Sequence, residues 1–151
     1  MCYSLPMTTA TAPLEAHICF AMYSASRSLT ARYRELLAPL GITYPQYLAL
    51  LVLWETGTIT VSQLGERLFL DSGTLSPLLR RMEAAGLIAK SRSVDDERVV
   101  EVSLTDAGDA MRSEGPRIGE AICDATGLPL DELIALQRQI AVVAEHVRAL
   151  A

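Results

Sequence analysis

The stretch from Ile59 to Thr105 limits the possible folds most, because several local structure signals follow one another there in a fixed order. Thr60 and Gln63 have the spacing of a capping box, in which each side chain satisfies the other residue's backbone N–H. A helix is therefore predicted to begin at this point and to turn Leu64 and Leu68 inward.

A second helix is predicted directly afterwards. Asp71 or Ser72 can cap it, and Gly86 follows at the position where a left-handed residue ends a helix. Apolar residues recur along it at three- and four-residue spacing, namely Leu75, Leu78, Leu79 and Met82.

A hairpin is predicted after the second helix. Residues 87–92 and 98–104 have strand character, the polar residues 94–97 separate them, and Thr105 opens the next helix. Helix, turn, helix and hairpin in this order are typical of a winged helix-turn-helix, a DNA-reading unit. The predicted fold class is therefore mainly α with a small β-wing.

Residues 72–85 are predicted to enter the major groove of DNA. The wetter face of this helix carries side chains suited to base edges or phosphates, namely Ser72, Thr74, Ser76, Arg80 and Arg81. The formal net charge of −5 opposes indiscriminate binding to nucleic acid. Charges act within a Debye length of ~8 Å, however, and basic residues cluster on the helix and the wing. We therefore expect binding that depends on a specific site.

Composition fits one domain over residues 14–151 after a loose tail at 1–13, since half of the 151 residues are hydrophobic. No apolar run approaches the ~20 residues of a membrane span, and the first residues lack the features of a secretion signal. Three cysteines without an export signal indicate the reducing cytoplasm, where a disulfide is transient and regulatory. We expect a cytoplasmic protein with no membrane partner.

Helices are predicted on both sides of the winged unit. Residues 14–38 indicate one long helix that Pro39 and Gly41 end, and Pro45 starts a short, uniformly apolar one. Residues 106–125 indicate a helix that is interrupted or bent around Gly115–Pro116. From residue 131 onward, apolar residues alternate steps of three and four, as in helices that pack on a partner.

That partner is either the chain's own first helix or a second copy. Two recognition helices one DNA turn apart read a pseudo-palindromic operator, so doubling suits a winged unit. We expect a homodimer built from dimerisation helices at about 14–40 and 106–151.

The wing residues Asp96-Glu97-Arg98 and the following VSLTDAG at 102–108 resemble the MarR family of transcription regulators. Further motifs are similar to its organic-hydroperoxide-sensing branch, OhrR. They are CFAMY at 19–23 with Ser26-Arg27, LGITYPQY at 40–47 and LDSGTLSPLL at 70–79. The resemblance covers nearly the whole chain.

The resemblance implies a sensing unit in which Cys19 reacts with peroxide and Tyr33 and Tyr44 of the partner subunit hydrogen-bond to it. Cys123 corresponds to the resolving thiol of the two-cysteine type. On the wing, Arg98 would reach into the minor groove while Asp96 braces its guanidinium.

The chemistry explains why these residue types belong together. A thiolate attacks the O–O bond, yet an ordinary cysteine with a pKa of about 8.5 is only a few per cent ionised at neutral pH. Phenolic O–H groups stabilise the thiolate by hydrogen bonding without adding positive charge. Apolar neighbours such as Ile18, Phe20 and Met22 would admit an apolar organic hydroperoxide. The product is a sulfenic acid, which a second thiol converts to a disulfide.

Plainer interpretations of the same residues stay open. A lone cysteine such as Cys19 or Cys123 is usually a small buried hydrophobe. Tyr33 fits the apolar stripe of its helix, and Tyr44 before a proline can be a rim residue. Cys2 lies in the tail and has no assigned role. The two histidines lack partners at metal-ligand spacing, so no metal and no cofactor is expected.

The sequence therefore predicts a redox-sensing repressor that binds operator DNA when Cys19 is reduced and is released when an organic hydroperoxide oxidises it. A thiol peroxidase is the enzymatic alternative, although the 59–105 unit would then have no purpose. A MarR-type regulator relieved by a non-covalent phenolic ligand is the other alternative.

Overall fold

The computed structural model describes residues 13–94 and 96–150. Its contacts divide into a central unit, Leu36–Glu120, and a terminal unit made of the described parts of Met1–Glu35 and Ala121–Ala151. The predicted single domain over 14–151 stays a prediction, and most of the expected tail at 1–13 lies outside the described residues, as does Cys2.

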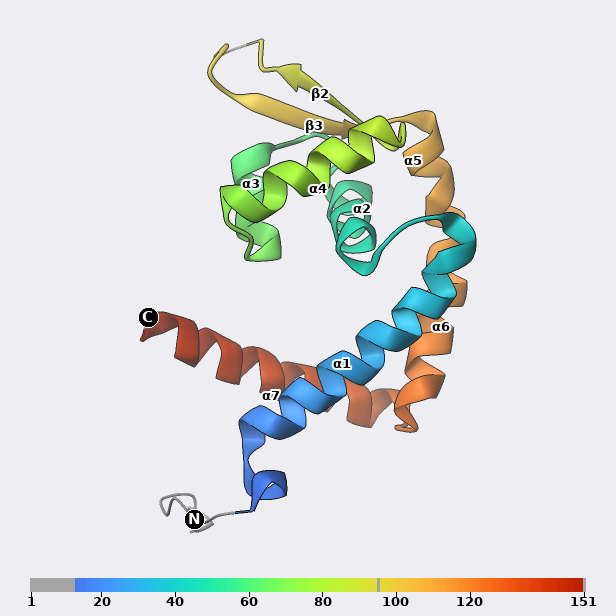
Figure 1. Cartoon of the computed structure of the whole chain (residues 1–151), viewed down its shortest axis with the longest axis vertical. Coiled ribbons are helices and arrows are strands. Elements are labelled where there is room, and N and C mark those ends of the chain that lie inside the picture. Colours follow the sequence, from blue (N-terminus) through green and yellow to red (C-terminus); the bar gives the residue numbers. More distant parts are fainter. Residues whose placement is uncertain (1–12, 95, 151) are drawn as a thin grey trace. The chain divides into compact units, whose positions relative to one another are not determined.

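Helix α2 (Tyr44–Thr56) is the core of the central unit, and a short 3-10 turn, η2 (Ala38–Leu40), precedes it. A capping box starts α2, because Gln46 Oε1 accepts a 2.8 Å hydrogen bond from the Thr43 backbone N–H. The helix packs against α3, α4 and β3 (Figure 1). Its predicted burial is confirmed at most positions, namely Tyr47, Ala49, Leu50, Val52 and Leu53.

Helices α3 (Val61–Leu68) and α4 (Ser72–Ala84) form the helix-turn-helix. The predicted capping box at Thr60 and Gln63 is confirmed, and Asp71 is the residue that caps α4. Gly86 adopts a φ of 70° just after α4, as the sequence predicted. Phe69, in the turn between the helices, is the one non-glycine residue with positive φ among those described, at 53°.

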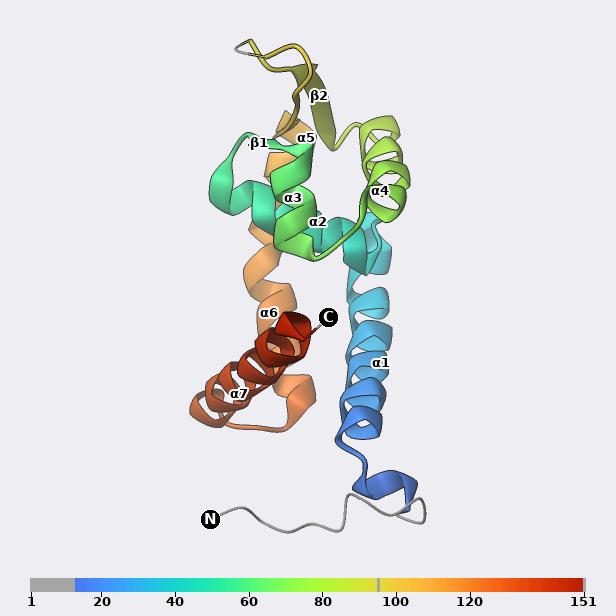
Figure 2. The same cartoon turned by 90° about the vertical axis from the view of Figure 1, so that its left-hand side faces the viewer.

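Strands β2 (Ile88–Arg92) and β3 (Val100–Leu104) form the predicted hairpin, which extends past α3 and α4 in both views (Figures 1 and 2). The sheet also has a third strand that the sequence analysis missed, β1 (Ile59–Thr60), and the strand order is β1-β3-β2. In this antiparallel sheet Val102 of β3 faces Ile59 on one side and Lys90 on the other.

The chain leaves the hairpin through α5 (Asp106–Ala110), the 3-10 turn η3 (Met111–Glu114) and α6 (Gly115–Thr126). Thr105 caps α5, since its side chain accepts a hydrogen bond from the Gly108 N–H at 3.2 Å. The helix predicted from residue 106 is interrupted just before Gly115, as expected, because the 3-10 turn η3 separates α5 from α6.

The terminal unit contains η1 (Leu14–Ala16), most of α1 (Ile18–Leu37), the end of α6 and α7 (Leu130–Ala149). The predicted continuous helix from Leu14 is wrong at its start, because His17 adopts extended angles and separates η1 from α1. None of the residues in α7 is buried.

No single helix in the described residues is long and apolar enough to cross a membrane. The bent pair 18–40 and 44–56 passes such a test when its two parts are counted together, by length and composition only. In this fold the second part of the pair is the core helix α2, in which six residues are buried.

Candidate nucleic-acid interface and cysteine site

The N-terminus of α4 is fixed by Asp71. Its carboxylate accepts 2.8 Å and 3.1 Å hydrogen bonds from the N–H and the hydroxyl of Thr74. These bonds hold the pKa of Asp71 below its ordinary value, the backbone bond contributing most. Because Leu75, Leu78, Leu79 and Met82 are buried, the opposite face of α4 is exposed to solvent. All of the predicted contact residues of α4 lie exposed, namely Ser72, Thr74, Ser76, Arg80 and Arg81.

Hydrogen bonds within the wing tip close it. The Ser93 N–H donates to the Val99 carbonyl, and Arg92 Nη1 donates to the Glu97 carbonyl, both at 2.9 Å. Asp96 Oδ1 accepts a 2.9 Å hydrogen bond from the backbone N–H of Arg98. Asp96 therefore contacts the backbone of Arg98, whereas the family resemblance implied a contact with the Arg98 guanidinium. The Arg98 side chain extends exposed from the tip.

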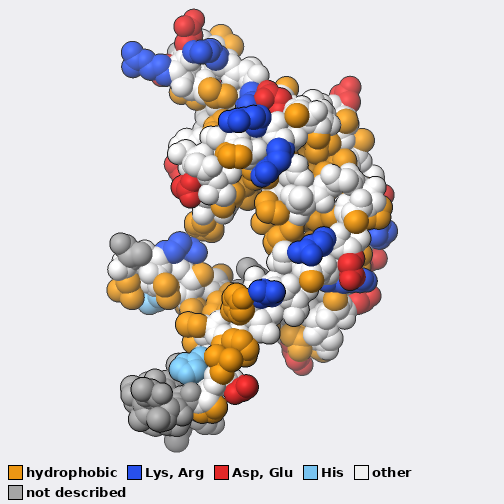
Figure 3. Space-filling model, in the orientation of Figure 1, with side chains coloured by type: hydrophobic (Ala, Val, Ile, Leu, Met, Phe, Trp, Pro, Cys, Tyr) orange, Lys and Arg blue, Asp and Glu red, His pale blue; other side chains and the backbone are white. Residues whose placement is uncertain are grey.

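A groove of about 680 Å³ runs between α3, α4 and the wing. Three predicted DNA-contact residues line it together, namely Ser76, Arg80 and Arg98, and Lys90 of β2 joins them. Lys and Arg side chains are visible over α4 and at the wing, with acidic side chains among them (Figure 3). The groove thus offers cations and hydroxyls to a phosphate backbone while the chain's net charge stays negative.

An ion pair that the sequence analysis missed joins α4 to the wing. Glu83 Oε2, near the end of α4, lies 2.7 Å from Lys90 Nζ on β2. No sequence pattern identifies the pair, because the two residues meet only through the packing of α4 on β2.

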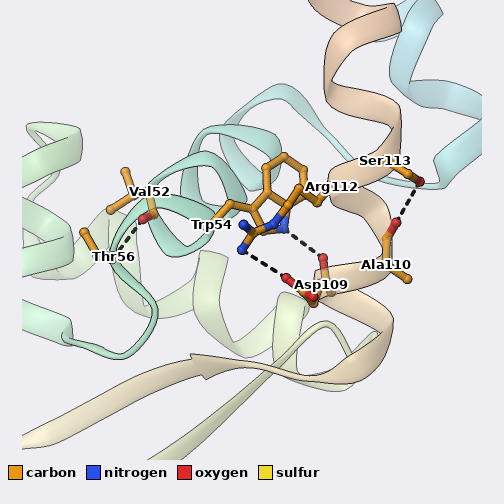
Figure 4. A network of polar contacts seen from close by, with 8 residues as sticks. Val52, Trp54, Thr56, Asp109, Ala110, Arg112 and Ser113 are labelled. Carbon is orange, nitrogen blue, oxygen red and sulfur yellow. Dashed lines mark hydrogen bonds and ion pairs between the residues drawn. The ribbon is translucent and has the colours of Figure 1, made fainter.

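A second missed feature holds the base of the wing. The Thr105 hydroxyl donates a 2.5 Å hydrogen bond to the Gly86 carbonyl, so the start of α5 is tied to the end of α4. The Trp54 indole N–H of α2 donates a 3.0 Å bond to the Gly108 carbonyl (Figure 4). A Cβ at Gly108 would lie 2.1 Å from the Leu87 carbonyl oxygen, so only glycine fits this close approach.

The predicted sensing cysteines lie in the terminal unit as free thiols. Cys19 occupies the first turn of α1 and is exposed. Cys123 lies on α6 and is half-buried, and its backbone carbonyl accepts a 2.7 Å hydrogen bond from the Thr126 hydroxyl. Of the expected apolar neighbours of Cys19, Phe20 and Met22 are half-buried and Ile18 is exposed.

The two predicted thiolate donors are both half-buried tyrosines. Tyr33 lies on the same helix as Cys19, fourteen residues on, which at 1.5 Å per residue separates them by about 21 Å. Tyr33 of the same chain therefore cannot hydrogen-bond to Cys19. Tyr44 belongs to the central unit, where burial raises the pKa of its phenol.

The terminal unit also carries uncovered apolar surface. A groove of about 590 Å³ is lined by α1, the end of α6 and α7, including Leu29, Leu136 and Ile140. The apolar residues predicted to form a helix seam on α7 are largely exposed, from 41% at Ile140 to 61% at Val147. Within the described parts of the chain, no three His, Cys, Asp or Glu side chains gather as a metal site.

The fold and its groove define a protein of the winged helix-turn-helix class. A sequence pattern of the MarR family matches residues 42–100. The chain is 54% identical over 101 residues to the organic hydroperoxide resistance transcriptional regulator of Bacillus subtilis (strain 168), a match covering 67% of this chain and 69% of that protein. It is 44% identical over 136 residues to the HTH-type transcriptional regulator TtmR of Methylorubrum extorquens (strain PA1), covering 90% and 70%.

A solved structure of reduced AbfR bound to DNA is similar, with a TM-score of 0.73 and 35% identity over 89% of this chain and 93% of that one. AbfR has also been solved in an overoxidized form bound to DNA and in a disulfide form. The chain belongs to the MarR family, as the sequence resemblance indicated, and it is a transcriptional regulator of that family.

Proposed function

We propose that this protein is a homodimeric repressor that binds operator DNA while Cys19 is reduced and leaves it after an organic hydroperoxide oxidises that thiol. One observation carries the proposal: an exposed free thiol at Cys19 in a chain whose other unit has a groove lined by Ser76, Arg80, Lys90 and Arg98. The name of the Bacillus subtilis relative and the reduced, overoxidized and disulfide forms of AbfR support a redox role. The proposed site of action is the reducing cytoplasm.

At the operator, α4 would enter the major groove and the wing the minor groove. Ser72, Thr74 and Ser76 would meet base edges or nearby phosphates, and Arg80 and Arg81 phosphates or a guanine. Arg98 would insert from the wing tip. The exposure of all these side chains is consistent with such contacts.

A second copy would cover the apolar face of α7. Residues such as Val143, 45% exposed, are costly to leave in water, at roughly 25 cal/mol for each Å² of apolar surface. Pairing would bring two recognition helices to one duplex, so a pseudo-palindromic operator with half-sites about 10 bp apart, or a multiple of that, is expected.

The sensing reaction would proceed in two balanced steps. The Cys19 thiolate attacks the O–O bond of the hydroperoxide, which breaks to give a sulfenic acid at Cys19 and, after protonation of the departing alkoxide, an alcohol. The Cys123 thiol then attacks the sulfenic sulfur, forming a disulfide and releasing water. The peroxide is reduced and the two thiols are oxidised.

The tyrosines would act from the partner subunit. The separation of about 21 Å along α1 excludes Tyr33 of the same chain, so a donor role for Tyr33 requires a second copy. The Tyr44 phenol is already protonated at neutral pH at its ordinary pKa of about 10, and burial raises that pKa further, so its O–H can act as a hydrogen-bond donor. Formation of the disulfide would then favour a conformation in which the recognition helices no longer match the spacing of the half-sites.

The experiment is a fluorescence-anisotropy titration of the reduced protein with an operator duplex, before and after cumene hydroperoxide. Wild-type protein should lose affinity and regain it with dithiothreitol, while Cys19→Ser should bind equally well with or without peroxide. A Cys19→Ser protein that still responds would refute the proposal and favour a non-covalent ligand. Continuous peroxide turnover without any operator binding would refute it in favour of a thiol peroxidase.

A further inference from the structure

The ion pair between Glu83 and Lys90 lies beside the proposed DNA groove. Glu83 is in the last turn of α4, Lys90 is in the middle of β2, and their charged atoms are 2.7 Å apart. Their side chains are 41% and 29% exposed, so both still reach solvent. Lys90 itself lines the groove with Arg80 and Arg98.

The other two cations of this groove differ from Lys90. Neither Arg80 nor Arg98 forms an ion pair with any residue in the described ranges 13–94 and 96–150. Among the described residues, Lys90 is thus the groove cation that pairs with a carboxylate of the protein. A phosphate that approaches Lys90 must compete with a carboxylate already in contact.

We propose that Glu83 is a specificity-determining residue, because its ion pair with Lys90 withholds one cation from the DNA phosphates. This inference rests on the proposed DNA-binding function.

The effect falls mainly on DNA of arbitrary sequence. Binding to such DNA comes almost entirely from neutralised phosphates, so each withheld cation lowers its affinity directly. Operator binding adds base contacts from α4 and the wing, which require a fixed distance between the two. The ion pair ties α4 to β2 and helps to hold that distance. It therefore weakens complexes with DNA of arbitrary sequence and supports the complex with the operator.

The test compares wild type with Glu83→Gln, which keeps the shape of the side chain and removes its charge. The probes are poly(dI–dC) and the duplex that reduced wild-type protein enriches from a random pool, each titrated from 50 to 200 mM salt. On poly(dI–dC) the slope of log K against log salt should steepen by about 0.9 for each protomer bound. Between 50 and 200 mM salt, this change in slope corresponds to an additional loss of affinity of about 3.5-fold for each protomer bound. At 50 mM salt the affinity for poly(dI–dC) should rise more than the affinity for the enriched duplex, so the preference for the enriched duplex should fall.

Glu55→Gln is the matched control. Glu55 and Arg67 also form an ion pair between two elements of the central unit, α2 and α3, at 2.6 Å, but neither residue lines the groove. The control changes the net charge by the same amount and should leave the salt slope near that of wild type. In a Lys90→Gln background, Glu83→Gln should no longer steepen the slope, because no withheld cation remains.

Three results would overturn the inference: equal slopes for Glu83→Gln and Glu55→Gln, a slope that steepens just as much without Lys90, or affinities for both probes that rise in parallel. Circular dichroism of each variant separates these results from misfolding. A wild-type protein that enriches no duplex would instead refute the proposed function, and the slopes on poly(dI–dC) would still decide whether Glu83 withholds Lys90 from phosphates.

Discussion

Replacing Gly108 by alanine tests the joint at the base of the wing, where the start of α5 packs closely against the turn at Gly86 and Leu87 that follows α4. The added methyl group would lie 2.1 Å from the Leu87 carbonyl oxygen and 3.2 Å from a methyl group of Leu104. The first contact is between backbone segments, so no side-chain rotation relieves it. Either α5 or the turn after α4 has to move by roughly 1 Å to restore ordinary van der Waals separation.

The expected destabilisation follows from three contributions. Overpacking costs about 1–3 kcal/mol, and the severity of this contact places it at the upper end of that range. Movement of the Gly108 carbonyl would break its hydrogen bond from Trp54, which contributes about 0.5–1.5 kcal/mol. The better helix propensity of alanine offsets about 1 kcal/mol. The free energy of unfolding should therefore fall by about 3 kcal/mol, with a drop in Tm of about 6–12 °C.

Urea unfolding followed by circular dichroism measures this loss, and Gly119→Ala is the matched control. A Cβ at Gly119 meets nothing within 4 Å, and the residue lies inside α6, so the same substitution there should stabilise by about 0.5–1 kcal/mol. Equal stabilities of Gly108→Ala and wild type, or equal losses at both glycines, would refute the reasoning. If the joint also positions α4 and the wing, Gly108→Ala should weaken operator binding below the unfolding transition.

Four further outcomes are expected. In a Cys2→Ser background, organic hydroperoxide should produce a covalent dimer on a non-reducing gel that dithiothreitol reverses, and Cys123→Ser should abolish it; an undiminished dimer would contradict a resolving role. Tyr33→Phe removes a donor and keeps the ring, so alkylation of the reactive thiol at fixed pH should slow, whereas an unchanged rate would exclude this tyrosine as a donor. Arg98→Ala should weaken operator binding by about 1–3 kcal/mol if its contact is base-specific, while equal weakening on all sequences would indicate a phosphate contact. Asp71 has a pKa held below its usual 3.8, so its contribution to stability is present above that pH and is lost as the pH falls below it. The stability advantage of wild type over Asp71→Ala in urea should accordingly shrink between pH 7 and pH 3, and a constant advantage would show that the cap does not depend on charge.

Local signals predicted most of the central unit. Capping residues and end glycines act within one turn of the chain, so Thr60, Asp71 and Gly86 marked the limits of α3 and α4 in the sequence alone. The same is true of the interruption before Gly115, where a glycine and a proline weaken the helix and the 3-10 turn η3 replaces it.

Features that depend on distant pairing were not predictable. Strand β1 has only two residues, and it exists because Ile59 pairs with Val102, far along the chain. The ion pair of Lys90 and the hydrogen bond of Trp54 likewise join elements whose packing no local pattern encodes. At the cysteine site, the sequence indicated which residue types take part. The structure places Cys19 and Tyr33 on one continuous helix, so these two residues of the same chain lie far apart.

The wing tip carries a consequence for how operator preference can evolve. Its described residues bond to one another: Ser93 to Val99, Arg92 to Glu97, and Asp96 to the backbone of Arg98. A loop that is held by hydrogen bonds among its own residues tolerates substitution or insertion, because the packing of the rest of the unit does not depend on it. In homologous proteins, the contacts of the wing tip with the minor groove can therefore change through substitutions in the tip alone, while the packing of α2, α3 and α4 stays the same.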